Sequence, residues 1–176
     1  MKFTEVNIRK MLHKDYAHMA KWLSTKEVLE FFGDVNAPFT IEQVKTKYEP
    51  RVNREVLVFP YIVELNETPA GFMQQYKISK EKQEEFGYPS PCSVYGIDQF
   101  IGEPELFNQG LGTIMVTNFI GYLFRTTDAE IIIVDPEVTN VRAIRCYEKC
   151  GFRKVKKVNE KTNWLMDFNS GRMKNL

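Results

Sequence analysis

The chain has 176 residues, of which 43% are hydrophobic and 27% charged, and its formal net charge is +1. Length and composition are typical of a soluble globular protein, so we expect a single domain over residues 1–176. The balanced charge argues against a general nucleic-acid-binding protein, and no apolar run approaches the roughly 20 residues of a membrane span.

The first half of the chain predicts a strand, three helices and a strand pair. Apolar residues first alternate and then recur at helical spacing, and Thr40 and Gln43 have the spacing of a capping box. A polar stretch with one glycine and two prolines predicts a flexible loop. In chain order we expect a strand over residues 6–12, a helix after the turn at 13–15, helices over 26–32 and from Thr40, strands over 56–64 and 70–78 joined by a turn at 66–69, and the loop over 79–91.

The second half is organised around residues 93–125, where a strand is followed by a glycine-bounded loop and a long helix. The strand carries a lone carboxylate, Asp98, and the helix begins near Gly110 and Gly112. Beyond it we expect an apolar strand over residues 129–134, a helix from Asn140 through Cys150 closed by Gly151, and strands over 152–157 and 162–168. The predicted order is β-α-α-β-β-β-α-β-α-β-β, a mixed α/β (α+β) fold.

The junction at Gly110 and Gly112 suits an anionic ligand. The start of a helix presents unpaired backbone N–H groups and the positive end of the helix dipole. Glycine also lacks the Cβ that would keep a pyrophosphate away from those amides. Glycines serve ordinary turns as well, so the alternative is a strand-to-helix turn with nothing bound.

Charge is unevenly distributed along the chain. Residues 83–124 contain no lysine or arginine but five acidic residues, whereas residues 140–157 contain seven basic residues and one acid. Such a pattern predicts two oppositely charged ligands, with chance clustering of surface charge as the alternative. Arg142 and Arg145 lie in the basic stretch and either approach a phosphate or are solvated.

The N-terminus and the cysteines indicate the cytoplasm. The first ten residues lack the apolar core of a signal peptide. Cys92, Cys146 and Cys150 fit a reducing compartment better than a disulfide scaffold. The two histidines lie near the N-terminus and there is no C-x-x-C motif, so we expect no metal site and no cysteine nucleophile.

The element order, the QGLGT loop and the later NVRAIRCYEKCGF segment together resemble the GNAT acetyltransferase superfamily. The resemblance implies a central sheet splayed between the fourth and fifth strands, and a loop that cradles the pyrophosphate of acetyl-CoA. The later family pattern matches at Asn140, Ala143, Tyr147, Gly151 and Phe152. In one departure, Phe107 stands where many members have Arg or Gln, so phosphate recognition would rest more on backbone amides, aided by Gln109.

Three segments are similar to aminoglycoside 6′-N-acetyltransferases, in the branch that also forms half of bifunctional acetyltransferase–phosphotransferase resistance enzymes. They are EVLEFFGD, YGIDQFIGEPELFNQGLGT and VDPEVTNVRAIRCYEKCGF. The resemblance implies direct acetyl transfer from acetyl-CoA to the 6′-amine of an aminoglycoside in a ternary complex, and antibiotic resistance as the result. The alternatives are a GNAT enzyme for a polyamine, siderophore precursor or protein N-terminus, and a non-catalytic CoA-sensing module.

Asp98 and Tyr147 are the predicted catalytic residues. Acetyl transfer needs an amine that has lost its proton, and Asp98 would receive the ammonium and take that proton directly or through water. Otherwise it is a solvent-facing carboxylate on a half-exposed strand. The resemblance implies that Tyr147 protonates or hydrogen-bonds the leaving sulfur; the alternative is an interior aromatic residue with a satisfied hydroxyl.

The resemblance also implies the binding residues. Backbone N–H groups over residues 99–101 would hydrogen-bond the acetyl carbonyl, and Asn140 would contact the pantetheine arm, cap its helix, or do both. The predicted cofactor residues are Phe100, Ile101, Asn108, Gln109, Gly110, Leu111, Gly112, Thr113, Asn140, Ala143 and Tyr147. The predicted acceptor residues are Phe32, Asp34, Tyr76, Glu84, Asp98 and Asp135. Asp135 would hold a second ammonium, or else it only forms a turn before Pro136.

Overall fold

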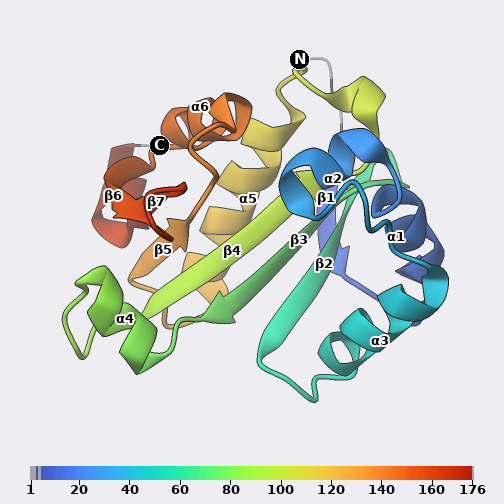
Figure 1. Cartoon of the computed structure of the whole chain (residues 1–176). Coiled ribbons are helices and arrows are strands. Elements are labelled where there is room, and N and C mark those ends of the chain that lie inside the picture. Colours follow the sequence, from blue (N-terminus) through green and yellow to red (C-terminus); the bar gives the residue numbers. More distant parts are fainter. Residues whose placement is uncertain (1–2, 4, 176) are drawn as a thin grey trace. The chain divides into compact units, whose positions relative to one another are not determined.

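A computed structural model describes residue 3 and residues 5–175 (Figure 1). The chain falls into two compact units. Unit 1 runs to Gln74 and includes Asp98–Gly112, and unit 2 comprises Gln75–Ile97 and the chain from Thr113 onwards. The seven strands follow the order β1-β2-β3-β4-β5-β7-β6. Among the described residues, no helix combines the length and apolar character needed to cross a membrane.

Unit 1 contains β1 (Val6–Lys10), α1 (Tyr16–Trp22), α2 (Lys26–Phe32), α3 (Ile41–Val52), β2 (Val58–Leu65) and parts of β3 (Thr68–Lys77) and β4 (Val94–Ile101). Short 3-10 turns cover His13–Asp15 and Pro104–Leu106. Strands β1 and β2 pair antiparallel, and α3 lies against both α1 and β2 (Figure 1). The three helical ranges predicted between the first two strands are confirmed, whereas the predicted element order, which has two helices there, is one helix short.

Two local predictions in unit 1 are confirmed at the atomic level. Thr40 Oγ1 accepts from Gln43 N–H at 3.2 Å and Gln43 Oε1 accepts from Thr40 N–H at 2.8 Å, which closes the capping box of α3. The turn between β2 and β3 places Asn66 and Glu67 at φ 49° and 63°. Two consecutive left-handed residues are what a two-residue hairpin connection requires.

The start of β2 corrects a prediction. The strand begins at Val58 rather than at residue 56, and Leu57 is 78% exposed. Strand β1 ends at Lys10, which pairs with Tyr61, so the residues before β2 have no β1 residue opposite them. The prediction started the strand two residues too early, because it relied on apolar character and not on pairing with β1.

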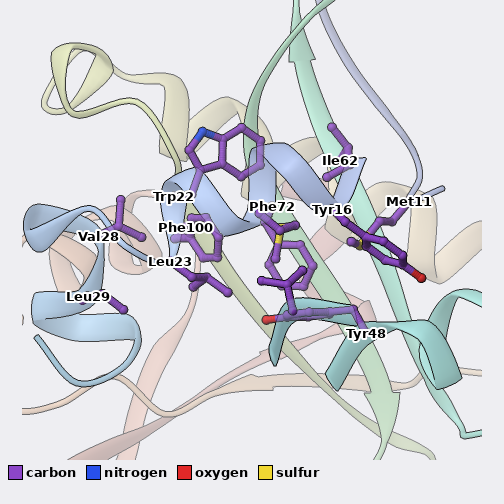
Figure 2. Close-up of a cluster of buried hydrophobic side chains, with 12 residues drawn as sticks. Met11, Tyr16, Trp22, Leu23, Val28, Leu29, Tyr48, Ile62, Phe72 and Phe100 are labelled. Carbon is purple, nitrogen blue, oxygen red and sulfur yellow. The ribbon is translucent and has the colours of Figure 1, made fainter. Parts of the chain in front are cut away.

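The core of unit 1 is an aromatic cluster between the helices and the strands (Figure 2). Phe72 of β3 stacks on Phe100 of β4 with ring centroids 5.3 Å apart, and Trp22 meets Phe100 edge-on at 6.0 Å. A Cβ on Gly102 would lie 2.3 Å from the Trp22 indole, so the close approach of α1 to β4 requires glycine there. This packing fixes β3 and β4 beside the helices.

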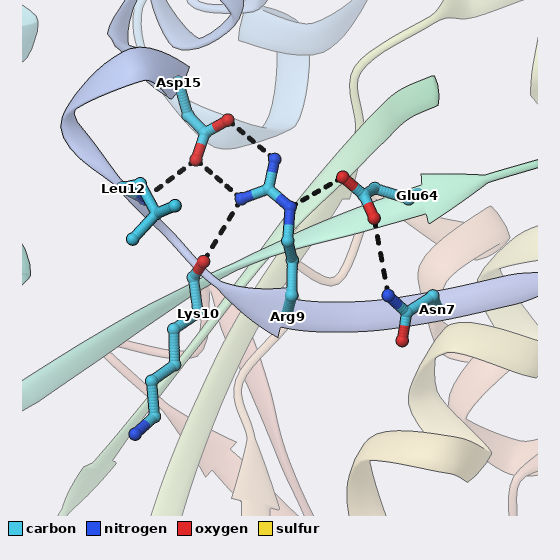
Figure 3. Close-up of polar contacts among 6 residues, drawn as sticks. All are labelled: Asn7, Arg9, Lys10, Leu12, Asp15 and Glu64. Carbon is cyan, nitrogen blue, oxygen red and sulfur yellow. Dashed lines mark hydrogen bonds and ion pairs between the residues drawn. The ribbon is translucent and has the colours of Figure 1, made fainter. Parts of the chain in front are cut away.

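A buried carboxylate ties the end of β1 to the first helical turn (Figure 3). Asp15 is 1% exposed and accepts two hydrogen bonds from the Arg9 guanidinium at 2.8 Å and one from Leu12 N–H at 2.8 Å. Arg9 Nε also donates to Glu64 on β2 at 2.6 Å. Burial raises the pKa of Asp15, but these hydrogen bonds outweigh it, so the pKa lies below its ordinary value.

Asp15→Asn should therefore weaken the pH dependence of stability. Because the folded-state pKa is the lower one, the carboxylate stabilises the fold above the unfolded pKa of about 4, and this contribution is lost as the pH falls through the folded pKa. We expect the substitution to lower the free energy of unfolding by about 2 kcal/mol at pH 7 and by clearly less at pH 3. Urea denaturation at both pH values measures this, and an equal loss at the two would contradict it.

Unit 2 contains α4 (Lys80–Phe86), β5 (Ile131–Val134), α6 (Val141–Lys149), β6 (Arg153–Val158), β7 (Asn163–Asn169), most of α5 (Leu111–Thr126), and a 3-10 turn over Ser170–Asn175. Strand β5 pairs parallel with β4 over Val94–Gly96 and antiparallel with β7, and β7 pairs antiparallel with β6. The predicted mixed α/β class is confirmed, including the final strand pair and the apolar strand β5, whose four residues are all buried.

The flexible loop predicted over residues 79–91 is wrong, because most of it is the helix α4. Ser79 caps this helix by accepting from Lys82 N–H, and Gly87 ends it in a left-handed conformation at φ 86°. Lys82 and Glu85 form an ion pair across one turn at 2.9 Å, and Phe86 is buried. The observed order is β-α-α-α-β-β-α-β-α-β-α-β-β, with more helices than predicted.

Candidate functional site

The carboxylate of Asp98 belongs to a polar network in unit 1. Asp98 is half-buried on β4, and its Oδ2 accepts from Gln74 Nε2 on β3 at 2.6 Å. The Gln74 Oε1 accepts from Arg51 Nη1 on α3 at 2.7 Å. Alternate residues of a strand share a face, so the Gln74–Asp98 pair continues the face that carries the Phe72–Phe100 stack. The carboxylate therefore stands where the apolar core of unit 1 gives way to polar side chains.

Helix α3 supplies the charged surroundings of this network. The Arg51 guanidinium lies 5.1 Å from the ring centre of Tyr48, and the Lys47 ammonium lies 5.5 Å from it. Burial lowers the pKa of Lys47, and Arg51 lowers it further, while the Asp98 charge opposes them. Burial raises the pKa of Tyr48, Arg51 counteracts this, and the Asp98 charge adds to it. The Lys47 charge thus interacts with that of Asp98, whereas Arg51 is connected to Asp98 through the Gln74 amide.

Sequence reasoning did not identify Gln74 or Arg51. Gln74 had one signal, because two consecutive glutamines interrupt an otherwise apolar strand, and Gln74 is only 8% exposed. A buried amide needs partners, which marks such a residue for attention. Arg51 had no comparable signal, since its partner lies 23 residues further along the chain.

The glycine loop has the conformation that a phosphate cradle needs. Gly110 has φ +89°, and a Cβ built there would meet no atom within 4 Å, so space is open above its backbone. Helix α5 begins directly afterwards at Leu111. Asn108 is exposed and left-handed at φ 58°, and Gln109 Nε2 donates to the carbonyl of Glu105. The backbone at Gly110 is therefore open to a ligand, and the start of a helix is suited to an anion, whereas the Gln109 side chain is engaged within the loop.

The departure at Phe107 has a structural reason. Phe107 packs against the core cluster of unit 1, so an apolar side chain at this position contributes to core packing. Phe32 and Phe100, predicted at the acceptor and cofactor sites, also pack in that cluster, with ring centroids 4.6 Å apart. Phe100 is 9% exposed, which leaves its backbone as the part available to a ligand. Asp34 is exposed and accepts from Asn36 N–H at 2.8 Å, forming a local turn.

In unit 2, three of the predicted cofactor residues belong to helix α6 and its N-cap, namely Asn140, Ala143 and Tyr147. Asn140 Oδ1 accepts from Ala143 N–H at 3.1 Å, which confirms its capping role. Tyr147 is 8% exposed, and its ring lies 5.6 Å from that of Phe152. Gly151 ends the helix in the predicted left-handed conformation at φ +96°.

Helices α5 and α6 meet through two hydroxyl–thiol contacts. Thr113 Oγ1 lies 3.7 Å from Cys146 Sγ, and Thr117 Oγ1 donates to Cys150 Sγ at 3.6 Å. The neighbouring Cys150 thiol is the main cause that lowers the pKa of Cys146 to about 7. Among the described residues, no group of three or more His, Cys, Asp or Glu side chains is placed to hold a metal ion.

The remaining predicted acceptor residues of unit 2 occupy three separate elements. Asp135 is exposed just after β5, and its carbonyl accepts from Asn163 Nδ2 at 2.7 Å. Tyr76 is half-buried on β3, and a Cβ on Gly96 would lie 2.5 Å from its ring. Glu84 is exposed on α4. Unit 2 therefore gathers Asn140, Ala143 and Tyr147 on one helix but does not gather these three acceptor residues on one element.

The known proteins that this chain resembles in sequence include acetyltransferases. The model of the acetyltransferase (GNAT) domain family matches residues 11–160. Over 149 residues, the chain is 34% identical to an aminoglycoside N(6′)-acetyltransferase type 1 of Klebsiella pneumoniae, covering 85% of this chain and 74% of that protein.

Solved structures of a similar enzyme, AAC(6′)-Ib, match almost the entire fold. One contains acetyl-CoA and superposes with a TM-score of 0.85 at 32% identity, covering 97% of both chains. Another contains coenzyme A and kanamycin and superposes with a TM-score of 0.84 at 31% identity, covering 97% of this chain and 98% of that one.

Proposed function

The chain belongs to the GNAT acetyltransferase family, and we propose that it transfers the acetyl group of acetyl-CoA to the 6′-amine of aminoglycoside antibiotics. The observation that carries the proposal is the half-buried Asp98 carboxylate on β4, held by Gln74 at 2.6 Å. Acetylation removes an ammonium from the drug, and the consequence for the cell is resistance. We propose that the reaction takes place in the cytoplasm.

Asp98 binds the 6′-ammonium and accepts its proton. An amine attacks a carbonyl only through its free lone pair, so the proton must leave before or during attack. An ordinary aspartate, with a pKa near 4, is a weak base towards an amine. The contribution of Asp98 therefore combines ion pairing, orientation of the amine and removal of the proton, directly or through water.

The glycine loop and the start of α5 hold the co-substrate. Gly110 offers an open backbone position, and the first turn of a helix offers N–H donors to phosphate oxygens. Bound acetyl-CoA supplies the activated acetyl thioester. We propose that the backbone N–H groups of residues 99–101 would donate to the acetyl oxygen. Asn140, which caps α6, would contact the pantetheine arm, and the Tyr147 hydroxyl would donate to the leaving sulfur.

The acceptor is a polycation, and carboxylates suit it because each pairs with one ammonium. We propose that Asp135 would hold a second amine of the drug, and Phe32, Asp34, Tyr76 and Glu84 stay predicted acceptor residues. Several separated carboxylates select for the number of charges on a ligand. This separates aminoglycosides from acceptors that carry one amine.

Thiol release from acetyl-CoA by the purified protein tests the proposal. Kanamycin, tobramycin, spermidine and a short peptide are supplied separately, and mass spectrometry of the product locates the acetyl group. Turnover with the two aminoglycosides, modified at the 6′-amine, is expected. Turnover with spermidine or the peptide alone would assign the enzyme to another amine, and acetyl-CoA binding without turnover of any acceptor would favour a CoA-sensing module.

A further inference from the structure

We infer that Arg51 is a positioning residue for Asp98 and acts through the side chain of Gln74. This inference rests on the proposed function of Asp98. The three side chains form a continuous relay from α3 through β3 to β4, with Arg51 Nη1 2.7 Å from Gln74 Oε1 and Gln74 Nε2 2.6 Å from Asp98 Oδ2. All three belong to unit 1.

The relay works because an amide has two unlike ends. A carboxylate can only accept hydrogen bonds and a guanidinium can only donate them. Only one orientation of the Gln74 amide satisfies both neighbours, with its oxygen towards Arg51 and its nitrogen towards Asp98. Without Arg51, the buried Gln74 Oε1 loses its donor, and the amide can shift towards another donor and weaken its hydrogen bond to Asp98. Gln74 is 8% exposed, so water is a poor substitute for the lost partner.

Arg51 is itself held by rigid neighbours. Its guanidinium lies over the ring of Tyr48, which is 1% exposed and packs edge-on against Phe72 with ring centroids 5.5 Å apart (Figure 2). A guanidinium stacked on a fixed ring loses few further degrees of freedom when it forms a hydrogen bond. Packing in the core of unit 1 thus restrains Tyr48 and Arg51, and the hydrogen bonds through Gln74 restrain the Asp98 carboxylate.

The same arrangement places positive charge near the carboxylate. Arg51 and Lys47 are the cations of α3 that act on this region, and Tyr48 lies between them. The charges of Lys47 and Asp98 attract each other, and a charged carboxylate is what pairs with an ammonium. Arg51 therefore orients the carboxylate through Gln74, while Lys47 places a positive charge that attracts it.

Arg51→Met tests the relay, because methionine keeps an unbranched chain but has no donor. We expect kcat for kanamycin to fall about tenfold, the effect of one lost hydrogen bond in the transition state, while KM for acetyl-CoA stays unchanged. Arg51→Lys should recover most of kcat, since an ammonium can still donate to Gln74 Oε1. Lys45→Met on the exposed side of α3 is the matched control and should behave as the parent protein.

A double-variant cycle distinguishes the relay from general damage to the fold. In the Asp98→Asn background, Arg51→Met should cause little further loss, because Arg51 acts through Asp98. A parent-like kcat for Arg51→Met, a full additional loss in the double variant, or no recovery with lysine would each overturn the inference. Failure of the proposed function is recognised separately, since the parent protein would then not acetylate kanamycin; the cycle is then measured with the amine it does acetylate.

Discussion

Asp98→Asn is expected to lower kcat/KM for an aminoglycoside by about 100-fold or more and to leave acetyl-CoA affinity nearly unchanged. Asparagine has almost the same shape as aspartate, so the packing of β4 beside Phe100 is preserved. It carries no charge for the ammonium and cannot take a proton. The loss therefore reports the chemistry of the carboxylate rather than the space it fills.

The measurement is steady-state thiol release at saturating acetyl-CoA, with affinity for acetyl-CoA determined by calorimetry. Glu30→Gln is a suitable control, because Glu30 is an exposed carboxylate on α2 of the same unit. The control should keep parental turnover. If Asp98→Asn turned over at the parental rate, Asp98 would have no part in the mechanism, and the acceptor site would have to be sought around another carboxylate.

The sequence predicted the position of Asp98 but not what holds it. A strand pattern places a residue within its own element, and a lone carboxylate in an apolar strand is visible there. Gln74 lies 24 residues before Asp98, and Arg51 lies 23 residues before Gln74. Their contacts depend on how β3 pairs with β4 and where α3 packs. Neither register nor packing is encoded in local periodicity, so the network could not be predicted.

Features determined by a few neighbouring residues were predicted well. The capping box of Thr40 and Gln43, the left-handed Gly151 and the Asn140 cap each follow from local backbone chemistry. Helix α4 was missed although the Ser79 cap and the Lys82–Glu85 ion pair are also local signals. The glycine and two prolines of that stretch lie after the helix rather than inside it, so they terminate α4 instead of preventing it.

Gly110→Val should weaken acetyl-CoA binding by roughly 100-fold, the equivalent of losing one or two hydrogen bonds to a charged phosphate. The Cβ and its two methyl groups would fill the open space above the Gly110 backbone. Valine is also strained at φ +89°, because a β-branched residue rarely adopts the left-handed region. The affinity measured by calorimetry must therefore be separated from a loss of stability.

Gly87→Val makes that separation, because Gly87 has nearly the same conformation at φ +86° and also no atom within 4 Å of a built Cβ. It ends α4 and has no proposed part in cofactor binding. The two substitutions should lower the melting temperature similarly, since both force a branched residue into the same strained backbone. Only Gly110→Val should raise the Kd for acetyl-CoA. Equal affinities in the two variants would mean that the loop after β4 is an ordinary turn, and the pyrophosphate would have to be held elsewhere.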